Sequence, residues 1–161
     1  MGAGSSVRRE TRIPASPDQV RRVLLDFAAW PEWNTSMIIS VIEPKKKDPA
    51  SDLRAGDALK SDLHGTIVYP VVVENSPEKL AWRASFHGIV VAHHSFEFRP
   101  DPDSHYLEGR PGTIFVDEES VSGLLSFMFR SGWSQRMALE GRADKFLDEL
   151  VARVQVVTSL N

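Results

Sequence analysis

The sequence predicts an α+β fold in which a curved antiparallel β-sheet of six or seven strands packs against one long C-terminal helix. Three observations lead to this prediction. A helix-forming segment follows the first strand, the middle of the chain alternates between short strands and turns, and apolar residues adopt a helical period beyond Gly123. Such a sheet must curl to bury one face against a single helix, and wide spacing between the two layers would leave a cavity.

The first two elements are a strand over Val7–Ile13 and a helix that begins in the stretch SPDQVRRVLLDF. Ser16 can cap this helix, and Pro17 suits its first position. The dipeptide Trp30-Pro31 is expected to end it, because the residue before a proline is pushed out of the α region. The helix carries one apolar stripe with the i, i+3, i+4, i+7 spacing: Val20, Val23, Leu24 and Phe27.

From residue 37 to residue 121 the chain reads as strands separated by turns. The breaks carry turn-forming residues, among them His64-Gly65 and the PDPDS run from Pro100. Short, regularly punctuated strands indicate an antiparallel meander. The expected strands are Met37–Ile42, Asp57–Leu63, Thr66–Glu74, Lys79–Phe86, Ile89–Arg99 and Thr113–Val121.

The C-terminal segment predicts an amphipathic helix of about five turns, which can lie across a whole sheet. Its apolar stripe consists of Leu139, Ala143, Phe146, Leu147, Leu150 and Val154. Charged residues are expected elsewhere around the helix: Arg136, Glu140, Arg142, Asp144 and Lys145. We expect one domain over residues 7–157, with tails at 1–6 and 158–161.

Composition argues against several classes of function. The 161 residues are 42% hydrophobic and 25% charged, which suits one packed core. The formal charge of −3 comes without a basic stripe for nucleic acid. No apolar window approaches the roughly eighteen residues that cross a bilayer, and no secretory leader precedes the domain, so we expect a cytoplasmic protein. Cysteine is absent and the five histidines lack metal-ligand spacing, so we expect no metal. No P-loop or Rossmann glycine pattern appears either, and we expect no cofactor.

The adjacent histidines in VVAHHSFEF, residues 90–98, are the strongest candidates for chemistry. Alternate residues of a strand face the same side of the sheet. His94 is therefore expected to point inward with Phe96, and His93 to point outward with Glu97. Two rings that diverge in this way cannot ligate one metal ion.

Acidic residues on the next strand can meet His94 inside the sheet. If the two strands pair antiparallel, His94 lies across from Asp117 or Glu119. An imidazole beside a carboxylate in an apolar pocket can serve as a general acid/base couple. The carboxylate would raise the pKa of the histidine, and burial would oppose that rise. Three roles stay open for His94: a hydrogen-bonded core residue, a ligand contact, or a proton-transfer catalyst.

Three stretches resemble the SRPBCC, or START-like, superfamily of helix-grip domains: IPASPDQVRRVLLDFAAWPEWN, LAWRASFHGIVVAHHSFEF and GTIFVDEESVSGLL. The third looks like the strand-to-helix passage of its polyketide cyclase/dehydratase-like branch, and this pattern favours an inward Glu119. The resemblance implies a deep hydrophobic cavity between a curved sheet of about seven strands and the C-terminal helix. Members bind lipids, sterols, polyketides or plant-hormone-like ligands. Some catalyse aromatic cyclisation or dehydration without a metal or cofactor, and others only carry ligands.

Large side chains near these stretches are candidates for the cavity wall. Aromatic residues at such spacing are also typical of an ordinary core, whereas methionine suits a bulky ligand. The ligand-binding candidates are Trp33, Tyr69, Trp82, Phe96, Phe115, Phe127, Trp133 and Met137.

Three hypotheses about function follow, because a fold alone does not select one. The first is a cofactor-independent enzyme that performs cyclisation, dehydration or a related proton transfer on a polyketide-like metabolite. In it, His94 is the acid or base and Glu119 or Asp117 orients it. The second is a non-catalytic carrier or sensor of a hydrophobic ligand. The third is a protein-partner module, which would need a large exposed patch. The expected partner is a hydrophobic small molecule, and the expected state is a monomer or homodimer.

Overall fold

The computed structural model describes residues 5–36, 38–41, 52–63, 65–86, 90–106, 109–123 and 134–159. The first part of the chain forms β1 (Ser5–Ile13), α1 (Pro17–Leu25), the 3-10 helix η1 (Phe27–Ala29), α2 (Trp30–Trp33) and β2 (Ile38–Val41). The remainder forms β3 (Leu59–Leu63), β4 (Thr66–Val68), β5 (Val71–Asn75), β6 (Lys79–Phe86), β7 (Val90–Tyr106), β8 (Arg110–Gly123) and α3 (Ser134–Ser159).

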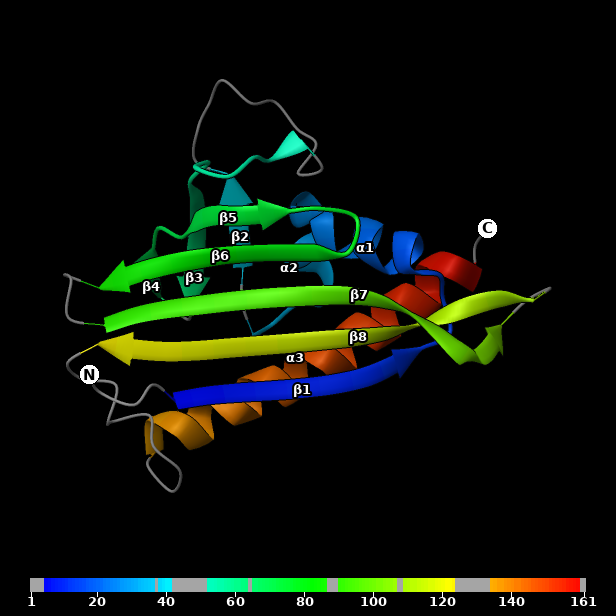
Figure 1. Cartoon of the computed structure of the whole chain (residues 1–161). Helices are drawn as coiled ribbons and strands as arrows, with labels where there is room; N and C mark the ends of the chain where they lie inside the picture. The colour runs from blue at the N-terminus through cyan, green and yellow to red at the C-terminus, as the bar shows by residue number, and fades with distance from the viewer. Residues whose placement is uncertain are drawn as a thin grey trace.

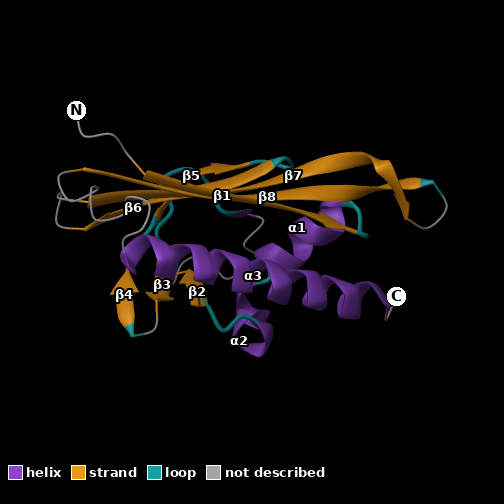
Figure 2. Cartoon of the chain, turned by 90° about the horizontal axis from the view of Figure 1, so that it is seen from below, coloured by secondary structure: helices purple, strands orange, loops and turns teal. Residues whose placement is uncertain are grey.

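Five strands form a large antiparallel sheet in the order β1-β8-β7-β6-β5, and β2-β3-β4 form a small second sheet. The helix α3 runs diagonally across one face of the large sheet (Figure 1). The other helices and the small sheet lie on that same face, so the molecule has one sheet layer and one mixed layer (Figure 2). This arrangement confirms the predicted α+β fold, with a sheet packed on a long C-terminal helix.

The predicted continuous sheet is divided because Thr66–Glu74 is not one strand. Pro70 separates β4 from β5, and a proline has no N–H to continue a ladder. The Pro70 carbonyl instead accepts from the Leu59 N–H at 2.7 Å. A single bridge between Ala58 and Val71 connects the two sheets at this corner.

The helix α1 begins as predicted. The Ser16 hydroxyl accepts from the Gln19 N–H, and the Gln19 side chain accepts from the Ser16 N–H at 3.0 Å, which makes a capping box. The predicted end at Trp30-Pro31 is wrong, because α1 stops at Leu25 and Pro31 lies in the first turn of α2. A proline fits there because the first turn of a helix needs no N–H donor.

The PDPDS run was predicted as a turn but lies within β7, which pairs with β8 beyond it. The ladder register shifts between Asp101 and His105, so a bulge accommodates the prolines. The strands β7 and β8 consequently form a long hairpin that projects past the end of the large sheet (Figure 1). The helix α3 is also longer than the five turns expected, since it has 26 residues.

The hydrophobic core lies between the large sheet and the helices. Its largest fully buried side chains are aromatic: Trp30, Phe96, Phe98 and Phe115. Phe146 of α3 packs against Trp30 and Phe96, with ring centroids 5.6 and 5.7 Å apart. Aromatic pairs at this spacing add to the stabilisation from burial alone. This cluster fixes α3 on the sheet and forms one end wall of the cavity described below.

Candidate active site

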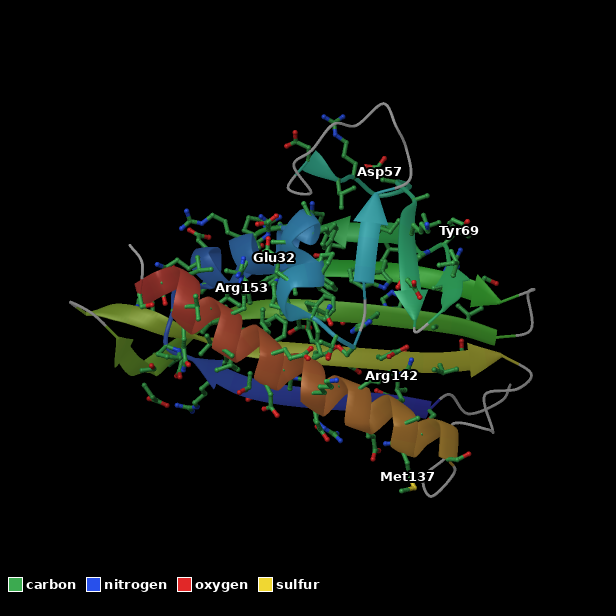
Figure 3. All side chains as sticks on the ribbon, turned by 180° about the vertical axis from the view of Figure 1, so that it is seen from behind. Glu32, Asp57, Tyr69, Met137, Arg142 and Arg153 are labelled. Atoms are coloured by element: carbon green, nitrogen blue, oxygen red, sulfur yellow. The ribbon has the colours of Figure 1, made fainter. Side chains whose placement is uncertain are left out.

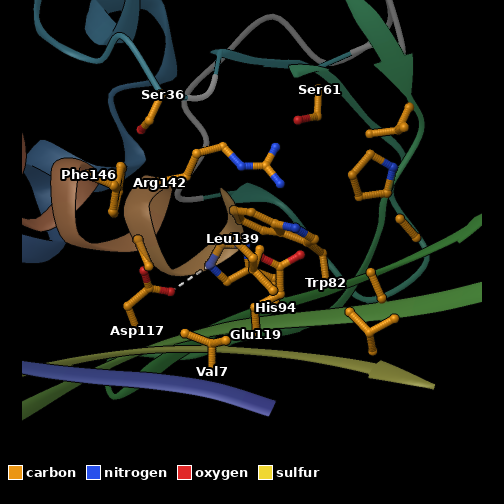
Figure 4. Close-up of a pocket in the computed structure, with 16 residues that line it drawn as sticks. Val7, Ser36, Ser61, Trp82, His94, Asp117, Glu119, Leu139, Arg142 and Phe146 are labelled. Atoms are coloured by element: carbon orange, nitrogen blue, oxygen red, sulfur yellow. Dashed lines mark hydrogen bonds and ion pairs between the residues drawn. The ribbon is translucent and has the colours of Figure 1, made fainter. Parts of the chain in front are cut away.

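A cavity of about 150 Å³ lies between the large sheet, the small sheet and the N-terminal half of α3 (Figure 4). Most of its wall is apolar and includes Val68, Pro70, Trp82, Ala84, Leu139 and Phe146. Its polar side chains are Ser36, Ser61, His94, Asp117, Glu119 and Arg142. An apolar hollow with a few convergent polar groups is the usual form of a small-molecule site.

His94 and Asp117 are joined by a hydrogen bond of 2.6 Å between Nε2 and Oδ1. Only 13% of the His94 side chain and 4% of the Asp117 side chain are exposed, so the pair is largely withdrawn from water. In the ladder of β7 and β8, His94 stands opposite Glu119, and Asp117 stands opposite Phe96. His94 therefore reaches its hydrogen-bond partner diagonally, which neighbouring strands allow for long side chains.

Two aromatic rings hold the imidazole in place. Trp82, the partner of His94 in the ladder of β6 and β7, lies 5.2 Å away between ring centroids and nearly edge-on. Phe96, the next inward residue of β7, lies at 4.4 Å. Packing on two sides together with a hydrogen bond restricts rotation of the ring, so its nitrogens are preorganised.

The charges around His94 decide its protonation. Burial disfavours the imidazolium, but the charge and hydrogen bond of Asp117, with a further contribution from Glu119, outweigh this effect. The pKa of His94 is therefore raised above its ordinary value, against an opposing contribution from the Arg142 guanidinium. Since Nε2 is engaged by Asp117 and Nδ1 bonds to none of the described residues, Nδ1 is the nitrogen available for proton exchange.

Arg142 is a cavity residue that the sequence prediction missed, because its charge suggested the solvent side of the helix. Its guanidinium extends from α3 into the cavity (Figure 4). The signal that could have found it is spacing. Leu139, Arg142, Ala143 and Phe146 follow i, i+3, i+4 and i+7, and all four line the cavity.

Two serines of the wall, Ser36 and Ser61, were also missed. Ser36 lies between α2 and β2, and its hydroxyl donates to the Asn34 side-chain oxygen at 2.9 Å. Ser61 lies in β3, where the inward residues are Leu59 and Ser61. Serine carries no pattern that distinguishes an inward from an outward position, so only the structure locates these two.

The aromatic candidates separate into cavity wall and core. Trp82 lines the cavity, as expected. Phe96 and Phe115 are fully buried and stack on each other at 5.8 Å below it. Trp33 packs on Trp30 and Phe146 and lines a different hollow, between α1, α2 and the end of α3.

Two candidates point away from the cavity. Tyr69 is 60% exposed and Met137 is 65% exposed, and both lie at the surface (Figure 3). Tyr69 stands between Val68 and Pro70, which face inward, so alternation directs it outward. Met137 precedes Leu139 by two positions and so occupies the opposite side of the helix. The candidates Phe127 and Trp133 lie outside the described residues.

Within the described ranges, no group of three or more histidine, aspartate or glutamate side chains is placed to hold a metal ion. In the same ranges, no helix is both long and apolar enough to cross a membrane.

Several solved structures of distant proteins have a similar fold. A hypothetical protein from Helicobacter pylori superposes with a TM-score of 0.71 at 18% identity, over 93% of this chain and 88% of that chain. Norcoclaurine synthase from Thalictrum flavum, a point mutant in complex with a transition-state analogue, gives 0.66 at 10% identity, over 97% of both chains. A START superfamily protein from Mycobacterium smegmatis gives 0.64 at 15% identity, over 94% and 98% of the two chains. At these identities the likeness establishes the START-like fold alone.

Sequence comparison identifies a family for this chain but no individual curated relative. No curated protein matches the chain in sequence. The family pattern described as polyketide cyclase/dehydrase and lipid transport matches residues 5–155, which is nearly the whole chain. The match includes β1, the strands that carry His94 and Asp117, and most of α3. The chain therefore belongs to the polyketide cyclase/dehydrase and lipid transport family, and it has the START-like fold that the sequence motifs indicated.

Proposed function

We propose that the protein binds a small, largely hydrophobic metabolite in the cavity between sheet and helix, and that His94 and Asp117 catalyse a proton-transfer step on it. The reaction class is cyclisation, dehydration or a related step that needs no cofactor. The observation that carries this proposal is the 2.6 Å hydrogen bond between His94 and Asp117, located in a cavity whose wall is mostly apolar.

The two residues have separate roles in this proposal. Neutral His94 accepts at Nδ1 a proton from an acidic carbon of the ligand, while Asp117 holds the Nε2–H and stabilises the imidazolium that forms. In a dehydration, the imidazolium returns that proton to the departing hydroxyl, which leaves as water while the double bond forms. In a cyclisation, the carbanion attacks a carbonyl of the same molecule and the imidazolium protonates the resulting alkoxide.

Family membership and fold likeness support this reaction class, but they do not distinguish catalysis from lipid transport. The family description includes both cyclase/dehydrase activity and lipid transport. One structure of similar fold is of norcoclaurine synthase with a transition-state analogue, so this architecture can accommodate catalysis in that protein. The dyad is what favours catalysis in this chain, because a buried acid/base couple at a cavity is a frequent mark of an active site.

The test is turnover of candidate substrates, such as aromatic β-hydroxy ketones and short poly-β-keto acids, with His94→Ala and Asp117→Asn. We expect losses of about 10²- to 10⁴-fold, the usual contribution of a positioned acid or base. The matched control is His93→Ala, which removes the same ring from the neighbouring position on the other face of β7. Wild-type rates in both dyad variants would refute the catalytic roles.

A non-catalytic carrier is the second candidate, and one observation favours it. The His94 imidazole is packed between Trp82 and Phe96, as a satisfied polar residue within an apolar wall would be. A carrier would be purified with an unchanged ligand that raises its melting temperature. Native mass spectrometry that finds such a ligand intact after incubation, with no product, would favour the carrier.

A further inference from the structure

Two polar groups of the cavity lie apart from the His94–Asp117 pair: the Arg142 guanidinium and the Ser61 hydroxyl. Arg142 comes from α3 and Ser61 from β3, so a helix and the small sheet each contribute one of them. In Figure 4 both lie on the side of Trp82 opposite to Asp117 and Glu119. The proposed proton transfer uses neither group.

Arg142 has no partner in the described part of the chain, whereas two other arginines of the same helix have one. Arg136 bonds Glu140 at 2.7 Å, and Arg153 bonds Glu32 at 2.9 Å. Arg142 forms no hydrogen bond or ion pair with the described residues, although it lines a cavity with an apolar wall. A guanidinium has five hydrogen-bond donors and no acceptor, so a partner for it must supply acceptor oxygens.

Ser61 is an independent sign of a missing ligand group. The residue is 1% exposed, and its hydroxyl has no hydrogen-bond partner among the described residues. Burial of an unpaired hydroxyl costs stability, so such groups are uncommon in folded proteins. A ligand oxygen in the cavity would satisfy it.

The acidic residues of the cavity set the direction of a bound ligand. Asp117 is hydrogen-bonded to His94, and Glu119 stands opposite His94 in the ladder, so negative charge is concentrated at that end. Arg142 supplies positive charge at the other end (Figure 4). An anionic group is therefore attracted toward Arg142 and repelled by Glu119, which leaves the apolar part of the ligand beside Trp82 and His94.

We propose that Arg142 and Ser61 bind the carboxylate of the ligand, and that the natural ligand is a small hydrophobic carboxylic acid. A guanidinium matches a carboxylate with two parallel hydrogen bonds, and the serine hydroxyl donates a third. The cavity of about 150 Å³ limits the apolar body, since an apolar cavity of that size holds roughly one benzene ring. This inference deepens the function proposed above, because it assigns the substrate class of the same cavity.

The test compares two probes of equal shape, phenylacetate and the neutral phenylacetamide, by calorimetry or ligand-observed NMR. Wild-type protein is expected to bind the carboxylate about tenfold or more tightly than the amide, as one charge-assisted pair suffices for such a ratio. Arg142→Gln should abolish this preference, and Arg142→Lys should retain part of it. Ser61→Ala should weaken binding of the carboxylate about threefold.

Lys145→Gln is the matched control, since it removes one positive charge from an exposed position of the same helix and should keep the preference intact. Equal affinity for both probes, or an unchanged preference in a folded Arg142→Gln variant, would overturn the carboxylate site. The readout is binding, so the result is separate from that of the His94 variants. The protein could prefer the carboxylate probe through Arg142 and yet show no turnover. It could also turn over a substrate through His94 and yet show no preference for the carboxylate probe.

Discussion

His94 and Glu119 face each other directly across the ladder of β7 and β8, yet His94 forms its hydrogen bond with Asp117, two residues earlier on the same face. One imidazole is thus flanked by two carboxylates that differ in geometry. Asp117 contributes a hydrogen bond and a charge, whereas Glu119 contributes charge alone. The two acidic residues should consequently affect His94 unequally.

The first prediction concerns the pKa of His94. Asp117→Asn removes the charge and should return the pKa of His94 toward its ordinary value or below it, because burial then acts with less opposition. Glu119→Gln should lower the pKa in the same direction but less. NMR titration of the imidazole carbon-bound protons measures both shifts. An equal or larger effect of Glu119→Gln would contradict the assignment of Asp117 as the main partner.

The second prediction concerns stability against pH. The pKa of His94 is raised in the folded protein, so the folded state holds its proton more tightly than the unfolded chain does. This contribution to the free energy of unfolding is fully present below the ordinary histidine pKa of about 6.5 and is lost as pH rises through the raised value. Urea denaturation from pH 5 to 9 should show the advantage of wild type over His94→Gln decreasing with pH.

Strand alternation was enough to place His94 on the inner face and His93 on the other, because side-chain direction in a regular strand depends only on parity. The choice between Asp117 and Glu119 could not be made this way, since both share one face. The choice depends on the side chains reaching diagonally between strands, so that His94 bonds Asp117 and not the directly opposite Glu119. Arg142 was missed for a different reason: a charged residue within an apolar helical stripe was assigned to solvent, although its spacing from Leu139 and Phe146 indicated the cavity.

Other errors came from interactions distant in sequence. Tyr69 reads as part of a strand that is apolar on both faces, and only the break at Pro70 and the second sheet show which face is outer. The PDPDS run has the composition of a turn, but pairing with β8 carries it into β7 through a bulge. In the PDPDS run, local propensity loses to cross-strand pairing.

The third prediction separates core from cavity wall. Phe96→Ala should lower the free energy of unfolding by about 3–5 kcal/mol, because Phe96 is fully buried beneath the site and contacts four other rings. Met137→Ala should change it by less than about 0.5 kcal/mol, as expected for an exposed side chain. Chemical denaturation measures both. A neutral Phe96→Ala would contradict the assignment of this ring to the core.

The last prediction uses the two serines of the cavity as a matched pair. Both are buried, at 1% exposure for Ser61 and 4% for Ser36, but among the residues that the structure describes only the Ser36 hydroxyl finds a partner, the Asn34 side-chain oxygen. In the ligand-free protein, Ser36→Ala should destabilise by about 1 kcal/mol because it breaks a buried hydrogen bond. Ser61→Ala should be neutral or stabilising, since it removes a hydroxyl that is buried without a partner.

The difference in stability between these two serine variants should narrow when phenylacetate is bound. Ligand then stabilises wild type by mass action, and Ser61→Ala gains less of this stabilisation because it lacks one donor to the carboxylate. Ser36→Ala should gain as much as wild type. Thermal unfolding with and without phenylacetate measures the gain for each variant. If Ser61→Ala destabilised the ligand-free protein as much as Ser36→Ala does, the Ser61 hydroxyl would already have a partner in the fold, and its assignment to the ligand carboxylate would be wrong.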